Sequence, residues 1–234
     1  NVYGDEHEPQ ISDTFFTWGH IHKGNPRVEP IGISRSIKNY ENIDYKKNKK
    51  ILLFIRTGNP YFRLSSSLFG YRNFIKYMKD VNNIPNLLDD VIKKNLIIRL
   101  YTTSYENTWK QAENFKINYP TLELDGQTKP LKKLVKQSKL IIYSYFSTGF
   151  YETMTANFPV VMLMDDKAHL LNLDFKIFYE ELFNQKIIFK STKELCRHIN
   201  KNYLDIENWW LDEKTQQARK NFVKNHSIKN TKFI

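Results

Sequence analysis

Cysteine is nearly absent from the sequence, since Cys196 is the only one among 234 residues. A single thiol excludes an internal disulfide framework and a zinc site built from several cysteines. The sequence also lacks the run of about 18 apolar residues that a membrane-spanning helix needs, and it lacks the segments of a signal peptide. We therefore expect a protein of the reducing cytoplasm.

Acidic side chains are outnumbered, with 25 Asp and Glu residues against 36 Lys and Arg residues, which leaves a formal net charge of +11. Charged residues make up 26% of the chain, an ordinary share for a globular protein. The hydrophobic share of 41% can support a buried core in one large domain or two small ones. The composition predicts a folded protein, and its basic balance favours an anionic partner.

The chain begins at Asn1, and its first residues resemble the interior of a protein more than its start. We interpret the sequence as a fragment of a longer protein, so an enzyme with its site between two domains would be represented by half of that site. The polar, lysine-rich segment 40–50 is interpreted as a linker between residues 1–39 and a domain that spans residues 51–234.

From Ile51 onward, short apolar runs alternate with segments of helical spacing, the pattern of strand-helix-strand units and a parallel sheet. Several runs are apolar at consecutive positions, as expected for strands that helices cover on both faces. The sequence therefore predicts an α/β fold with a doubly wound, mostly parallel six-stranded sheet. The predicted strands are Ile51–Ile55, Leu96–Tyr101, Thr121–Leu124, Leu140–Tyr145, Pro159–Met164 and Lys186–Phe189.

Apolar residues three and four positions apart predict helices that pack on this sheet. Ser191 and Glu194 have the spacing of a capping box, which predicts a helix that begins there and buries Leu195, Ile199 and Tyr203. A last helix is expected over Ile206–Lys224. The clearest other stripes are Tyr71, Phe74, Ile75 and Met78, and Phe175, Phe178, Tyr179, Leu182 and Phe183.

The residues after the first and fourth predicted strands are the first candidates for a binding site. Doubly wound sheets bind ligands at the carboxyl ends of their strands, where the strand order reverses. Arg56 follows the first strand, and Ser147, Thr148 and Gly149 follow the fourth. With the strand order 3-2-1-4-5-6 these strands are neighbours, which places Arg56 beside the Ser-Thr-Gly turn and Arg99 one strand further along.

The Ser147-Thr148-Gly149 turn leads from a predicted strand into a predicted helix. Such a turn offers free backbone N–H groups and two hydroxyls at the positive end of a helix dipole, which suits a phosphate. Gly149 permits close approach of the backbone, and Glu152 would accept hydrogen bonds from the hydroxyls of a ribose or sugar. In a purely structural alternative, Ser147 or Thr148 only caps the helix and Glu152 only complements its dipole.

The same passage resembles a known family. Leu140–Met154 (LIIYSYFSTGFYETM) and Asn157–Val161 (NFPVV) look like the donor-site segment of a family of bacterial surface-polysaccharide transferases with the two-domain GT-B glycosyltransferase fold. Further matches to that family occur in the same order along the chain. They are Ser12–Gly19 (SDTFFTWG) with Glu29–Gly32 (EPIG), Ile98–Tyr101 (IRLY), and Trp209-Trp210 with Gln216–Phe222 (QQARKNF).

The resemblance implies that residues 51–234 are the Rossmann-like half of a GT-B fold, which binds a nucleotide-activated sugar and ends in a helix that crosses to the other half. Residues 1–39 would be the remnant of, or linker from, a missing N-terminal domain that holds a saccharide or lipid-linked acceptor and the catalytic base. The implied enzyme makes surface polysaccharide at the cytoplasmic face of the inner membrane, and this fragment is inactive alone. The resemblance implies no metal and no cofactor. Together with the residues at the strand ends, it leads us to expect a donor site made of Arg56, Arg99, Tyr145, Ser147, Thr148, Gly149 and Glu152.

Other chemistry-bearing residues receive a structural interpretation. His7, His20 and His22 cluster with acidic residues where we expect the interdomain cleft, but their spacing fits no zinc motif. Cys196 is expected to be a buried, inert thiol. The remaining candidates, interpreted as helix-surface, loop or anchoring residues, are His169, His198, His226, Trp209 and Trp210.

Two alternative functions stay open. A basic protein rich in aromatic residues also fits a nucleic-acid-binding module, although the lysines are spread along the chain and no such motif occurs. A phosphate-binding fold of this class could equally serve polyol-phosphate transfer or sugar epimerisation, because the fold does not fix the reaction.

Overall fold

The computed structural model describes residues 4–19, 25–33, 36–55, 71–100, 110–145, 147–164 and 173–229. Arg56, Tyr101, His20, His22 and His169, which the sequence analysis singled out, lie outside these residues. In the described part of the chain, no helix combines the length and the apolar character needed to cross a membrane.

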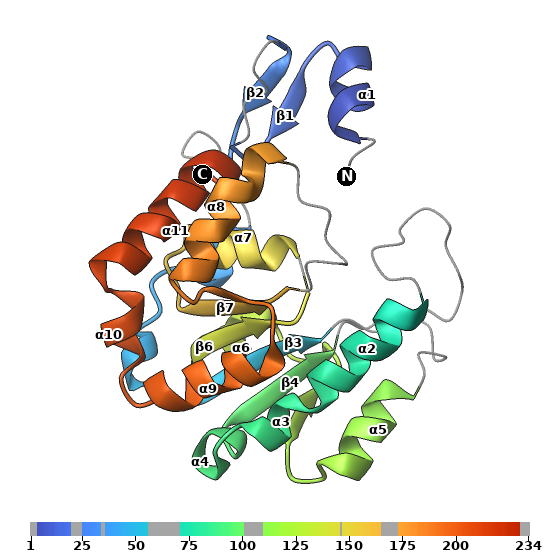
Figure 1. Cartoon of the computed structure of the whole chain (residues 1–234), viewed down its shortest axis with the longest axis vertical. Coiled ribbons are helices and arrows are strands. Elements are labelled where there is room, and N and C mark those ends of the chain that lie inside the picture. The colour runs from blue at the N-terminus through green and yellow to red at the C-terminus, as the bar shows by residue number, and fades with distance from the viewer. Residues whose placement is uncertain are drawn as a thin grey trace.

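Six parallel strands form the central sheet, in the order β5-β4-β3-β6-β7-β8 (Figure 1). Numbered along the chain within this sheet, the order is 3-2-1-4-5-6, so the predicted α/β fold and strand order are confirmed. Each strand lies within two residues of its predicted bounds. The strands are β3 (Lys50–Ile55), β4 (Leu96–Leu100), β5 (Glu123–Asp125), β6 (Ser138–Tyr143), β7 (Val160–Leu163) and β8 (Ile188–Phe189).

Helices cover both faces of the sheet, and each face has its own hydrophobic core. Alternate strand residues point to opposite faces, so Leu52 belongs to one core and its neighbours Ile51 and Leu53 to the other. The first core packs against α2 (Tyr71–Asn82), α3 (Ile84–Leu87), α4 (Asp90–Lys93), α5 (Gln111–Asn118) and α9 (Thr192–Asn202). The second packs against α6 (Leu131–Val135), α7 (Thr148–Thr155), α8 (Leu173–Asn184) and α11 (Glu213–His226).

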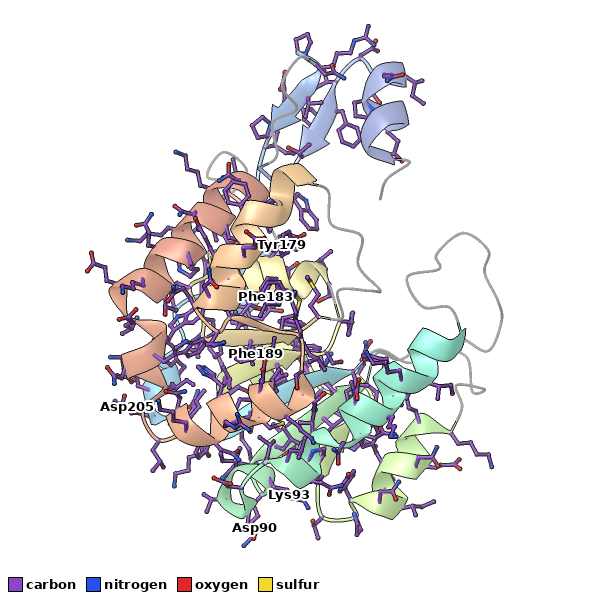
Figure 2. All side chains as sticks on the ribbon, in the orientation of Figure 1. Asp90, Lys93, Tyr179, Phe183, Phe189 and Asp205 are labelled. Carbon is purple, nitrogen blue, oxygen red and sulfur yellow. The ribbon has the colours of Figure 1, made fainter. Side chains whose placement is uncertain are left out.

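Aromatic rings fill the second core between α7, α8 and α11. The ring centroid of Phe222 lies 5.8 Å from that of Phe150 and 5.8 Å from that of Tyr179. Tyr179 is labelled on α8 in Figure 2, where side chains fill the space between the helices and the sheet. A side-chain hydrogen bond joins Tyr179 to Tyr151 of α7. The aromatic residues of this region therefore hold three helices together.

A small two-stranded sheet precedes the central one and joins the C-terminal end of the chain (Figure 1). The amide of Ile228 donates to the carbonyl of Trp18 at 2.8 Å, and Ile33 pairs with Lys229. The Trp18 ring also meets the Tyr151 ring of α7 edge-on, with centroids 5.9 Å apart. The predicted division of the chain into domains stays a prediction. The elements here are α1 (Gly4–Ile11), β1 (Phe15–Thr17) and β2 (Val28–Pro30).

The segment 40–50, interpreted above as a linker, is folded against the sheet together with two short 3-10 helices, η1 (Ser36–Asn39) and η2 (Tyr45–Lys47). Tyr40 is only 2% exposed. The side-chain amide of Asn48 donates to the carbonyls of Lys136 and Ser138, at 2.8 and 2.9 Å. A tyrosine and an amide among the lysines therefore fix this segment, which the charge pattern alone did not indicate.

The predicted last helix is in fact two helices, α10 (Ile206–Trp210) and α11. The carboxylate of Asp212 accepts hydrogen bonds from the amides of Lys214 and Thr215, at 3.0 and 3.3 Å, and so starts a new helix. The helix predicted from the capping box begins at Thr192 as expected, but the Ser191 side chain makes no capping hydrogen bond.

Candidate functional site

The candidate site lies at the carboxyl edge of the sheet between β3 and β6, where the strand order reverses. This is the place where doubly wound sheets bind their ligands. The amide of Ser144 donates to the carbonyl of Phe54 at 3.2 Å, which holds the ends of the two strands together. Because β6 ends at Tyr143 and α7 begins at Thr148, the predicted Ser-Thr-Gly turn lies at this edge.

Ser147 is the N-cap residue of α7, with an extended backbone at φ −141° and ψ 159°. Its carbonyl accepts a hydrogen bond from the Phe150 amide at 3.1 Å, but its side chain makes no capping bond. The Oγ atom of Ser147 is buried and has no hydrogen-bond partner within the described part of the chain. The structural alternative of a Ser147 side-chain cap is therefore not what this structure shows. Thr148, the first helical residue, is exposed.

The opposite end of α7 is firmly held by the C-terminal helices. The Nη1 atom of Arg219 donates to the carbonyl of Met154 at 2.8 Å, and the indole Nε1 of Trp210 donates to the carbonyl of Asn157 at 3.3 Å. Gln216 also reaches the side chain of Asn157, at 3.1 Å. The motif Gln216–Phe222 and the Trp209-Trp210 pair, quoted for the resemblance, thus anchor the far end of the helix whose first turn lies at the candidate site.

Gly149 packs against a tyrosine of β6. A Cβ atom added at Gly149 would lie 2.6 Å from the hydroxyl oxygen of Tyr143 and 3.1 Å from its Cε1 and Cζ atoms. The Tyr143 ring cannot withdraw, because it stacks on Phe54 of β3 with ring centroids 4.8 Å apart. The absence of a side chain at Gly149, which the sequence analysis related to phosphate, therefore also lets α7 approach the sheet.

Three hydroxyl groups link this first turn to the segment that precedes the sheet. The hydroxyl of Tyr143 lies 3.2 Å from that of Tyr40 and 3.1 Å from that of Thr153, which in turn donates to the carbonyl of Gly149 at 2.6 Å. Burial raises the pKa of Tyr40 to about 12 and raises that of Tyr143 well above its ordinary value. Both tyrosines are therefore uncharged at neutral pH.

Glu152 and Tyr145, both expected above to belong to the donor site, lie near these groups. Glu152 is 9% exposed, and its carboxylate adds to the rise in the pKa of Tyr40 and of Tyr143 beyond the larger effect of burial. Tyr145 is half-buried in the turn between β6 and α7. The contact of either residue with a sugar stays a prediction.

Arg99, also assigned to the donor site, is engaged inside the fold. Its Nη1 atom bonds the carboxylate of Asp125 on the neighbouring strand and the carbonyl of Lys129. Its side chain is only 10% exposed, and that of Asp125 is fully buried. These contacts favour a structural role for Arg99, while Arg56 lies outside the described residues.

Sequence reasoning missed Tyr40, and it gave no role to Tyr143 and Arg219, which stood in passages quoted for the resemblance. The only signal for Tyr143 was its hydroxyl directly after the apolar run Leu140–Ile142, and Tyr40 stood in the lysine-rich segment. No group of three or more metal-binding side chains occurs among the residues that the structure describes. Cys196 is buried as expected, and burial raises its pKa to about 12.

The chain matches the model of one known protein family. A family model described as "LIC12162 family transferase" matches residues 2–234, nearly the whole chain. A sequence search of curated proteins finds no match.

The fold is similar to that of several solved structures at low sequence identity. A Listeria monocytogenes protein assigned as a UDP-N-acetylglucosamine 2-epimerase matches with a TM-score of 0.54 and 13% identity, over 93% of this chain and 59% of that one. The wall teichoic acid polymerase TagF matches with a TM-score of 0.49 and 14% identity, over 94% and 54%. Staphylococcus aureus MnaA, solved with UDP, matches with a TM-score of 0.46 and 15% identity, over 86% and 55%. The six-stranded parallel sheet and the match to the Listeria protein show that the chain has the Rossmann-like fold of a GT-B domain. The chain spans little more than half the length of each of these three proteins.

Proposed function

Because the chain belongs to the LIC12162 family of transferases, we propose that it binds a nucleotide-activated sugar at the first turn of α7 and serves in glycosyl transfer. The observation that carries this proposal is the turn itself. It lies where the strand order reverses, and the buried Oγ of Ser147 has no hydrogen-bond partner among the described residues. Buried polar atoms are normally paired, so a hydroxyl at such a place with no partner among the described residues supports a ligand oxygen as its partner.

A diphosphate is the chemical group that fits this turn. The first amides of a helix have no partner within the helix, and the helix dipole places partial positive charge there. The net charge of +11 adds a favourable long-range field for an anion. The nucleoside diphosphate would therefore be held by the amides of Thr148 and Gly149 and by the hydroxyl of Ser147.

The same groups have a role in the reaction. In glycosyl transfer the bond between the sugar and the diphosphate breaks, and negative charge grows on the leaving oxygen. Donors already in position stabilise that charge without reorganising, which is the main way such sites lower a barrier. The acceptor, a saccharide or a lipid-linked saccharide, would be held together with the catalytic base by a further part of the full-length enzyme. We therefore expect this stretch of chain to bind the donor and to catalyse no transfer alone. If the acceptor is lipid-linked, we expect the full-length enzyme to contact the membrane surface peripherally.

A thermal-shift screen tests the proposal. Ligand binding raises the melting temperature by mass action, by an amount that grows with the ratio of ligand concentration to Kd. UDP, GDP, CDP, CMP and UDP-N-acetylglucosamine would be compared with inorganic phosphate and with ATP. One nucleotide series is expected to raise the melting temperature well above the others. A higher melting temperature with inorganic phosphate alone would indicate a simple anion site. An unchanged melting temperature with every nucleotide would contradict the proposal.

A further inference from the structure

We propose that Tyr143 is a positioning residue for the anion-binding turn: its ring sets how closely the first turn of α7 approaches the sheet, and its hydroxyl connects that turn to Tyr40. The ligand that the turn binds rests on the function proposed above. The positioning itself is a property of the fold and is tested separately below.

The direction of each hydrogen bond in the hydroxyl chain follows from counting protons. The carbonyl of Gly149 can only accept, so the single hydroxyl proton of Thr153 is committed to it, at 2.6 Å. Tyr143 must then donate its own proton to Thr153, at 3.1 Å. Tyr40 must in turn donate to Tyr143, at 3.2 Å. The series of hydrogen bonds therefore runs in one direction, with each hydroxyl donating to the next, from Tyr40 to the backbone of the first turn of α7.

The ring of Tyr143 is held in a single place. It stacks on Phe54 with an interplanar angle of 9° and meets Phe150 edge-on, with an angle of 86°. Tyr143 is 1% exposed and Phe150 is fully buried. A ring fixed from two sides forms a rigid surface, and Gly149 rests on that surface with no room for a Cβ atom.

The far end of α7 is fixed as well, by Arg219 and Trp210. A helix held at its C-terminal end can adjust mainly at its N-terminal end. The contact between Gly149 and Tyr143 is therefore what sets the position of the amides of Thr148 and Gly149. A displacement of about 1 Å in such groups is enough to weaken binding and catalysis strongly.

Substitution at both contact residues tests this inference. Gly149→Ala should weaken nucleotide binding by about tenfold or more, although alanine favours a helix over glycine. Tyr143→Phe removes the nearest atom, the hydroxyl at 2.6 Å from the added Cβ, and should restore part of the lost affinity in the double variant. The matched control is Tyr119→Phe, which likewise removes a bonded tyrosine hydroxyl, the one that donates to the carbonyl of Asn82 at 2.6 Å, and should restore nothing. Equal loss of affinity from Gly149→Ala with Tyr143 and with Phe at that position overturns the inference.

A measurement without ligand separates this inference from the proposed function. Hydrogen exchange of the α7 amides, followed by mass spectrometry on the free protein, should be faster in Gly149→Ala and should return toward the wild-type rate in the double variant. If the wild type binds no nucleotide but exchange follows this pattern, the proposed function is wrong and the positioning role stands. If α7 exchange is the same in wild type and Gly149→Ala, the positioning role is wrong whatever the protein binds.

Discussion

The guanidinium Nη1 of Arg99 lies 2.5 Å from the Oδ2 of Asp125, in a buried ion pair between β4 and β5. The other carboxylate oxygen of Asp125 accepts from the hydroxyl of Thr128 and from the amide of Lys129, both at 3.1 Å. Arg99 closes the arrangement by donating to the carbonyl of Lys129 at 3.0 Å. The ion pair therefore fixes the turn between β5 and α6, which is a structural role for Arg99.

Arg99→Ala is expected to lower the free energy of unfolding by about 3–5 kcal/mol, because it leaves the buried carboxylate of Asp125 without its charge partner. Denaturant titration measures the change. The control is Arg197→Ala on α9, where the side chain is exposed and the loss should stay below about 1 kcal/mol. If Arg99→Ala has normal stability but loses nucleotide binding, Arg99 contacts the donor and has no structural role.

The lowered pKa of His198 predicts how the free energy of unfolding depends on pH. Burial lowers its pKa from the ordinary 6.5 to about 4, and the charges of Lys186 and Lys201 act in the same direction. Its Nδ1 lies 3.2 Å from the Asn202 amide nitrogen, and its ring lies 4.6 Å from that of Trp209. The folded state thus favours the neutral ring, while the unfolded state takes up a proton near its ordinary pKa. The stability that His198 contributes is full above pH 6.5 and falls as the pH decreases toward 4.

The measurement compares wild type with His198→Leu by denaturant unfolding at neutral and at mildly acidic pH. Carboxylates also titrate in this range, so the difference between the two proteins carries the information. The wild type should lose more stability on acidification than the variant. Parallel losses in the two proteins would mean that His198 is not held neutral by the fold.

Glu152→Gln addresses the sugar end of the donor. A carboxylate accepts hydroxyl hydrogen bonds more strongly than an amide, so the variant should bind the sugar nucleotide more weakly and the nucleoside diphosphate almost normally. Calorimetric titration with both ligands gives the ratio of the two Kd values. Glu194→Gln, on the exposed face of α9, is the control. An equal loss for both ligands would show that Glu152 supports the turn and does not contact the sugar.

The sheet could be predicted from sequence because buried parallel strands are apolar at consecutive positions and leave a plain pattern. Tyr40 could not, since a single tyrosine among lysines gives no periodic signal and its partner Tyr143 is more than a hundred residues away. The break before α11 was missed because Asp212, in sequence alone, looks like an ordinary exposed residue of a continuous helix. Only the structure shows that its carboxylate caps a new helix by accepting from the amides of Lys214 and Thr215. The position of the Ser147-Thr148-Gly149 turn at the sheet edge could be predicted from the strand pattern, whereas the pairing of Arg99 depends on a contact between strands that no local pattern indicates.

The central claim, that a nucleoside diphosphate binds the first amides of α7, is tested most directly by Thr148→Pro. Proline is well tolerated at the first position of a helix, and the extended backbone of Ser147 suits a following proline, so the variant should fold normally while lacking one amide donor. Thr148→Ala keeps that amide, and Glu213→Pro makes the same change at the first position of α11. Calorimetric titration with the best nucleotide of the screen should show Kd raised about tenfold or more in Thr148→Pro alone, the expected cost of a hydrogen bond to a charged group. Wild-type affinity in a folded Thr148→Pro would contradict the claim.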